Sequence, residues 1–195
     1  HYHRFPEDFA TLQQLGCNAY RASISWSRIF PDGSGAPNQA GLSFYQRLVD
    51  SLLEKSIQPM LTLYHWDLPL KLQTSGGWAN REVVKYFADY AAYLFDKLGD
   101  RVPFWITINE PAVHTICGHL NGSHAPGIAD WPTALQTAHH LLLSHAAAVK
   151  LFRQGSHPGQ IGITLNLTYF EPASAVLTDQ QATQRMDGIW NRWFL

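Results

Sequence analysis

A glutamate stands at the end of an apolar run in the segment Trp105-Ile-Thr-Ile-Asn-Glu-Pro-Ala-Val-His114. The run begins with aromatic and β-branched residues, as buried strands do. Glutamate is almost never fully buried without a partner, so Glu110 marks either a solvated strand end or a reactive site. A carboxyl group whose pKa is raised by burial or by a like charge can act as a general acid or base. Glu110 is therefore the first candidate for a reacting group.

The residues on either side of Glu110 restrict its geometry. Pro111 lacks an N–H and disfavours helical backbone before it, so Asn109 and Glu110 are expected to be extended and rigid. Strict alternation along a strand would send Asn109 and Glu110 to opposite faces. Both can reach one site only if the strand bulges or twists there, as strands often do beside active sites.

A second polar cluster, His65-Trp66-Asp67-Leu68-Pro69, follows another apolar run. Imidazole and carboxylate groups form hydrogen bonds with hydroxyls, and an indole offers a flat apolar face with one N–H donor. This combination suits a sugar, which has polar rims and apolar C–H faces. The alternative is that Trp66 packs beneath a loop while His65 is exposed to solvent.

Two further polar residues lie on apolar runs, Arg21 within one and Asn166 at the end of another. An unpaired buried guanidinium is very costly, so Arg21 in a buried position requires a carboxylate partner. The chain offers few candidates, which points to a partner on strands outside it. Asn166 either contacts a ligand or simply terminates its strand.

Other chemistry finds little support. The histidines at positions 139, 140 and 145 lack the i, i+4 spacing of a helical metal pair, and we interpret them as helix-packing residues. There is no Gly-rich phosphate loop with its lysine and no Gly-x-Ser-x-Gly elbow. The sequence therefore predicts neither a metal nor a cofactor.

The elements that must position these residues alternate along the chain. Apolar periodicity predicts helices over 5–15, 42–53, 83–98 and 135–152 and from about 179, with strands over 19–25, 59–64, 104–108 and 161–166. Strict alternation is typical of a parallel sheet with helical crossovers. Without a linker or low-complexity segment, residues 1–195 are expected to form one architectural unit.

In each of the four strands, one of the two alternating sets of side chains carries the polar residues, and most of these side chains are small. They are Arg21, Ser23, Ser25, Thr62, Thr107, Asn109, Thr164 and Asn166. An open doubly wound sheet carries helices on both faces and tends to be apolar throughout, so a polar face favours a barrel with helices only outside. A complete (β/α)8 barrel needs about 250 residues, and its active site is built from the loops after the strands. This chain would supply about half of such a barrel.

Composition excludes several classes of function. The 195 residues are 46% hydrophobic and 15% charged, with a formal net charge of -1. This balance indicates neither nucleic-acid binding nor a membrane surface, and no apolar run is long enough to span a bilayer. Cys17 and Cys117 imply no disulfide framework, which favours a reducing, cytoplasmic location. Both chain ends, His1 and Trp193-Phe-Leu195, look like cuts through a larger fold.

Together these residues resemble glycoside hydrolase family 1, the family of retaining β-glucosidases and β-galactosidases. The motifs that carry the resemblance run in the family's order along essentially the whole chain. They are HYHRFPEDFATLQQLGCNAYRASISWSRIFPDG, LTLYHWDLP, GGWANRE, TINEPAVH, HAPG, HHLLLSHAAAV, EPAS and NRWFL.

The resemblance implies a TIM barrel of which this chain supplies the second to fifth strands. It implies that Glu110 is the general acid/base and that Asn109 binds the sugar 2-hydroxyl. His65 and Trp66 resemble contacts to the sugar in the cleaved subsite. Arg21 resembles the arginine that supports the nucleophilic carboxylate, and Asn166 resembles a residue bordering the aglycone side.

The chain departs from the family in lacking the nucleophile, a second glutamate in a Glu-Asn-Gly setting on the seventh strand, and the first strand with its sugar-binding glutamine. We expect a parent β-glycosidase that cleaves terminal β-D-glucosyl or galactosyl residues, while this chain alone has little activity. The open strand edges invite pairing with the missing half of the barrel or with a second copy. The alternatives are a non-catalytic carbohydrate-binding or scaffold remnant, and a cellulase-type barrel, against which the LTLYHWDLP segment argues.

Overall fold

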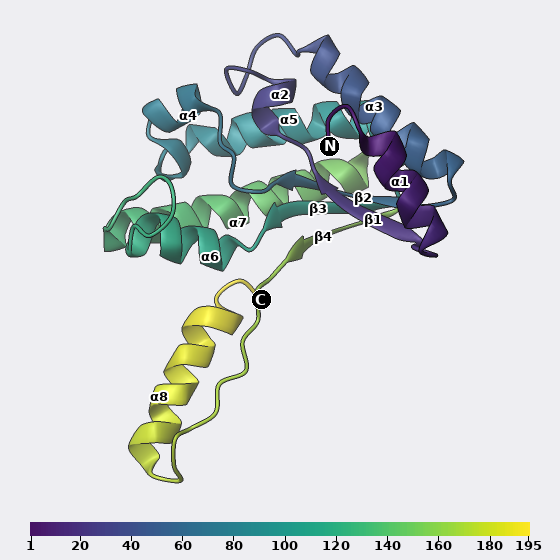
Figure 1. Cartoon of the computed structure of the whole chain (residues 1–195). Helices are drawn as coiled ribbons and strands as arrows, with labels where there is room; N and C mark the ends of the chain where they lie inside the picture. The colour runs from purple at the N-terminus through teal and green to yellow at the C-terminus, as the bar shows by residue number, and fades with distance from the viewer.

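Four short strands form one parallel sheet whose spatial order follows the chain (Figure 1). The computed structural model describes all residues from 1 to 195. The strands are β1 (Ala19–Ser23), β2 (Gln58–Tyr64), β3 (Phe104–Asn109) and β4 (Gln160–Thr164). All three neighbouring pairs are parallel, so the carboxyl ends of the four strands lie at the same edge of the sheet. The alternation predicted from the sequence is thereby confirmed.

Long helices connect the strands and lie against one side of the sheet, while the other side has no helix over it (Figure 1). They are α1 (Phe5–Gln14) before β1, and the crossover helices α3 (Gln39–Glu54), α5 (Glu82–Leu98) and α7 (Trp131–Gln154). Each predicted helix is present, with ends that differ from the sequence-based bounds by a few residues. No helix of the chain is long and apolar enough to cross a membrane.

Shorter elements occupy the loops that follow the strands. They are α2 (Trp26–Ile29), α4 (Leu70–Thr74), η1 (Gly77–Ala79), α6 (Pro111–Thr115) and η2 (Ile116–Leu120). None was predicted as a helix. The start of α2 also explains why β1 ends at Ser23 rather than at the predicted Ser25. These short elements bring the loops back over the strand ends.

The main hydrophobic core fills the space between the sheet and the helices. Leu61 and Leu63 of β2 and Trp105 of β3 belong to it, together with apolar side chains of α1, α3, α5 and α7. Two tyrosine hydroxyls from this layer fix the strand ends. Tyr45 on α3 accepts from the Ser25 N–H at 2.7 Å, and Tyr90 on α5 donates to the Leu63 carbonyl at 2.9 Å. The helices therefore hold the backbone where the loops begin.

The predicted polar face of the sheet is confirmed for β1, but the prediction is wrong for Thr107. In β1 exposed residues alternate with half-buried ones, and Arg21 and Ser23 are exposed. In β3 the residue opposite Thr62 is Ile106. Thr107 instead lies on the helix-covered side, where its hydroxyl is hydrogen-bonded to His145 of α7 at 2.8 Å and to the Gly162 carbonyl at 3.1 Å. Because helix and sheet satisfy this hydroxyl, its polarity does not mark the open face.

The chain after β4 projects away from the sheet as an arm (Figure 1). It contains α8 (Leu177–Asp187), near the helix predicted to begin at about Asp179, and η3 (Gly188–Arg192). No residue of α8 is buried. The last residues turn back, and Phe194 packs against Ala112 and Ala138. The arm thus ends beside the segment that follows Glu110.

Candidate active site

Polar side chains from all four strands meet at the carboxyl edge of the sheet, and Asn109 is at their centre. Asn109 is only 3% exposed. Its Oδ1 accepts hydrogen bonds from the Arg21 guanidinium of β1 and from the Thr164 hydroxyl of β4, the latter at 3.2 Å. Arg21 also donates from Nε to the Thr62 hydroxyl of β2 at 3.1 Å. This network of hydrogen bonds joins the side chains of the four strands on the open face of the sheet.

The Asn109 side chain can join this network on the open face because β3 is irregular. The register between β3 and β4 shifts between Ile106 and Asn109. With regular alternation Asn109 would share the helix-covered side with Thr107, two residues earlier. The bulge expected near Glu110 is therefore present, slightly earlier in the strand, and it turns the Asn109 side chain onto the open face.

The backbone of Glu110 is left-handed, with φ 46° and ψ 63°. The expectation that Pro111 would keep Glu110 extended is wrong. The Glu110 N–H donates to the Thr164 carbonyl at 3.0 Å, and the Glu110 carbonyl accepts from the His114 N–H at 3.1 Å, in the first turn of α6. Pro111 occupies the first helical position, where its missing N–H costs nothing. These bonds hold Glu110 in a conformation that costs about 1–2 kcal/mol for a residue with a side chain.

The carboxylate of Glu110 belongs to a half-buried side chain and takes part in none of the chain's ion pairs. His65 lies close enough to be influenced by it. Partial desolvation lowers the pKa of His65, Arg21 lowers it further, and the carboxylates of Glu110 and Asp67 oppose this shift. His65 is therefore neutral at pH 7 and able to both donate and accept hydrogen bonds.

Trp66 joins the loop after β2 to the end of β3. Its indole N–H donates to the Asn109 carbonyl at 2.7 Å, and its backbone is left-handed, with φ 77°. The neighbouring His65 is exposed, and its Nδ1 lies 3.0 Å from the Ser23 hydroxyl. The indole is half-buried. The part of the indole that solvent reaches is available for contact with a ligand.

Two expectations about site residues need correction. Arg21 was expected to be buried, but it is exposed and contacts Thr62, Asn109 and Thr164. Its carboxylate partner, expected on strands outside this chain, stays a prediction. Solvent reaches the guanidinium because the sheet face that carries it is open. Asn166 was placed at the end of a strand, whereas β4 ends at Thr164 and Asn166 is exposed beyond it. The structure does not bring Asn166 into the network around Asn109.

Sequence reasoning missed His114, which is 4% exposed beneath the site. Its ring stacks on that of Trp66, with centroids 6.3 Å apart and planes inclined by 28°. Burial, with smaller effects from His119 and His124, lowers the pKa of His114 to about 3, so the ring is neutral. The available signal was spacing, since His114 follows Glu110 by four positions, about one helical turn further on.

Comparison with known proteins identifies the family. The sequence model described as Glycosyl hydrolase family 1 matches residues 1–195. The chain belongs to glycosyl hydrolase family 1.

Relatives within glycosyl hydrolase family 1 are similar over the whole chain. β-Glucosidase A of Acetivibrio thermocellus is 52% identical over 195 residues, which are 100% of this chain and 44% of that protein. A 1,4-β-D-glucan glucohydrolase of Thermotoga neapolitana is 53% identical over 186 residues, 95% of this chain and 44% of its own length. The chain thus spans less than half the length of these curated relatives.

Solved structures of the family show the same fold. The family 1 β-glucosidase of Thermotoga maritima superimposes with a TM-score of 0.96 at 53% identity, covering 97% of this chain and 43% of that one. The same enzyme in complex with deoxynojirimycin gives a TM-score of 0.96. The four-stranded parallel sheet is therefore about half of a TIM barrel, as the polar strand face predicted.

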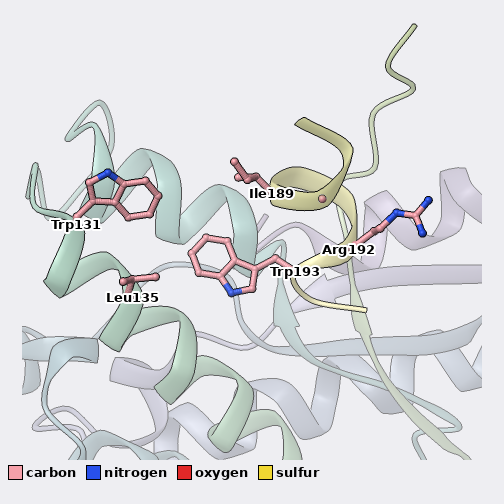
Figure 2. Close-up of a pocket in the computed structure, with 6 residues that line it drawn as sticks. Trp131, Leu135, Ile189, Arg192 and Trp193 are labelled. Atoms are coloured by element: carbon pink, nitrogen blue, oxygen red, sulfur yellow. The ribbon is translucent and has the colours of Figure 1, made fainter. Parts of the chain in front are cut away.

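An apolar pocket of about 320 Å³ lies between the start of α7 and the end of the arm (Figure 2). Trp131 and Leu135 of α7 line one side, and Ile189 and Trp193 line the other. The Arg192 side chain points away from it (Figure 2). The pocket has no carboxylate and shares no residue with the network around Asn109, so it is separate from the candidate active site.

Proposed function

We propose that this chain supplies the acid/base half of a retaining β-glycosidase. Its substrates are terminal β-D-glucosyl or galactosyl residues of oligosaccharides or of aryl and alkyl glycosides. The observation that carries the proposal is the position of Glu110. Its half-buried, unpaired carboxylate follows β3 beside His65, in a family whose relatives are β-glucosidases.

In the proposed mechanism Glu110 works with a second carboxylate. Retaining hydrolysis needs two carboxyl groups about 5 Å apart, of which one protonates the leaving oxygen while the other attacks the anomeric carbon. Glu110 gives its proton to the leaving oxygen as the glycosidic bond breaks and the glycosyl-enzyme forms. It then takes a proton from the water that hydrolyses this intermediate. The nucleophile comes from a part of the barrel outside this chain.

The hydrogen bonds of Asn109 support its proposed contact with the sugar 2-hydroxyl. Its Oδ1 already accepts from Arg21 and Thr164. This fixes the orientation of the amide, and the Nδ2 group is left free to donate to a ligand. Arg21, pre-positioned by the same network, has donors remaining for the nucleophilic carboxylate.

The remaining proposed contacts are made to two parts of the substrate, the sugar and the aglycone. His65 and the Trp66 indole are proposed to bind the sugar in the cleaved subsite, the first through hydroxyls and the second through its apolar ring face. Asn166, exposed beyond β4, is proposed to border the aglycone. These roles imply that the substrate lies across the carboxyl edge of the sheet.

Hydrolysis of 4-nitrophenyl β-D-glucoside tests the proposal. The full-length protein that carries this chain is expected to be active, whereas residues 1–195 alone, without the second carboxylate, are not. Glu110→Gln should lower kcat by about 10²–10⁴-fold. The matched control Glu82→Gln changes an exposed glutamate at the start of α5 and should have no effect. Saturable glucose binding without turnover by the full-length protein would favour a carbohydrate-binding remnant instead.

A further inference from the structure

The backbone of Trp66 has a conformation that residues with a side chain rarely adopt. Its φ of 77° lies in the left-handed region, where a residue with a side chain is strained. Such a conformation persists only when the surrounding structure holds it. The hydrogen bond from the indole N–H to the Asn109 carbonyl fixes one edge of the ring at 2.7 Å. The ring also packs against the edge of the main hydrophobic core. A single hydrogen bond along one edge leaves the tilt of the ring plane to such packing contacts.

Three imidazole rings surround the indole, and only one of them is buried. His65 lies edge-on at 5.4 Å and His124 is tilted at 5.6 Å, and both are exposed to solvent. His114 is almost completely buried, and its plane is close to parallel with that of Trp66. Offset-stacked rings at such separations attract one another, and a buried ring has little freedom to move. Of the three imidazoles, His114 is therefore the one able to support the face of the Trp66 ring.

His114 makes three polar contacts, one through its ring and two through its backbone. Its Nε2 lies 3.4 Å from the Tyr64 hydroxyl at the end of β2, and its carbonyl oxygen lies 3.3 Å from Nδ1 of His119. Its own N–H donates to the Glu110 carbonyl at 3.1 Å. Burial lowers the pKa of His114 to about 3, so the ring stays neutral and adds no charge beneath the site.

We propose that His114 is a positioning residue: its buried ring supports the Trp66 indole, and its backbone bond ties that support to Glu110. This inference rests on the proposed function, in which Trp66 binds the sugar and Glu110 transfers the proton. His114 touches neither the sugar nor the reacting atoms. It sets the distance and angle between the two groups that do, because one turn of α6 separates it from Glu110.

The test uses the full-length protein with three variants. His114→Leu removes the ring face at similar volume, and His114→Phe keeps a ring without its nitrogens. His140→Leu is the matched control, because His140 is also a buried histidine, bonded to the Trp78 carbonyl at 2.7 Å, and its ring is not among those that contact Trp66. His114→Leu should raise KM and the Kd for deoxynojirimycin about three- to tenfold, with a smaller change in kcat. His114→Phe should retain most of the affinity.

Two readouts separate positioning from a general loss of stability. In a Trp66→Ala background, His114→Leu should cause no further loss of affinity, because the two substitutions act through one contact. The indole N–H resonance of Trp66 should move in His114→Leu and stay in place in His140→Leu. An unchanged Kd and an unchanged resonance in His114→Leu would overturn the inference. A wild-type protein that neither binds deoxynojirimycin nor hydrolyses the glucoside overturns the proposed function, while the resonance still reports on the contact.

Discussion

The indole N–H of Trp66 donates a 2.7 Å hydrogen bond to the backbone carbonyl of Asn109. The two residues are 43 positions apart and follow different strands. Their bond closes the gap between the loop after β2 and the end of β3, and it leaves the Asn109 side chain free to bind Arg21 and Thr164. One backbone oxygen and one side-chain oxygen of Asn109 thus organise most of the site.

The Trp66 bond is testable by a substitution that keeps a ring. Trp66→Phe removes the N–H donor and leaves the Asn109 carbonyl without its partner, which costs about 1–3 kcal/mol for a buried acceptor. Affinity for deoxynojirimycin, measured by calorimetry, should fall. Trp131→Phe, a change to a half-exposed indole in the apolar pocket, serves as the control. Equal affinities in both variants would show that the bond does not organise the sugar site.

The free amide of Asn109 predicts a preference for substrates that carry a 2-hydroxyl. Asn109→Ala should lower kcat/KM for an aryl β-glucoside by about 10–100-fold, equivalent to about 1.4–2.8 kcal/mol, through the lost hydrogen bond and the altered Arg21 geometry. The same variant should lose much less with the 2-deoxyglucoside, which has no group to accept the bond. An equal loss with both substrates would assign Asn109 a purely structural role.

The buried His114 makes stability depend on pH in a defined direction. Its folded-state pKa of about 3 lies below the ordinary value of 6.5 for histidine, so the unfolded chain binds more protons between these values. Stability is therefore fully present above about pH 6.5 and is lost as the pH falls toward 3, by up to about 1.4 kcal/mol per pH unit. His119 and His145 also have lowered pKa values and add to the slope.

Urea unfolding of wild type and His114→Phe at pH 7 and pH 5 measures the His114 contribution. The variant lacks the titrating ring, so the loss of free energy of unfolding between the two pH values should be smaller than in wild type. Identical losses in the two proteins would mean that His114 titrates normally and is not buried in the folded state.

The hydroxyl of Thr107 is predicted to matter for stability and not for catalysis. Thr107→Val removes the partner of His145 and of the Gly162 carbonyl on the helix-covered side of the sheet, at a cost of about 1–3 kcal/mol. KM for glucosides should stay unchanged, because this side chain faces away from Asn109. Thr11→Val, at an exposed position of α1, should alter neither the stability nor KM. A raised KM with normal stability in Thr107→Val would place Thr107 on the open face after all.

Periodicity located the long elements because strands and helices bury one face in a regular pattern. The four strands, the long helices and the positions of Glu110, His65 and Trp66 after their strands were all accessible in this way. Family resemblance added the roles of these residues.

Features that depend on tertiary bonds were not accessible. Local preference before Pro111 predicted an extended Glu110, but two backbone bonds and α6 impose the left-handed form. The polarity of Thr107 suggested the open face, but His145, 38 residues away, satisfies its hydroxyl. Both errors involve a hydrogen-bond partner from a distant segment, the Thr164 carbonyl for the Glu110 N–H and the His145 ring for the Thr107 hydroxyl, and such partners cannot be read from a local pattern.

The role of Glu110 as the group that delivers the proton to the leaving oxygen is tested most directly by leaving-group dependence. In the full-length protein, kcat/KM of Glu110→Gln should be compared with wild type for cellobiose and for 2,4-dinitrophenyl β-D-glucoside. We expect a loss of about 10²–10⁴-fold for cellobiose, whose leaving oxygen needs a proton, and a far smaller loss for the dinitrophenyl glucoside, whose leaving group departs without one. Equal losses for the two substrates, or full activity toward cellobiose, would contradict this role.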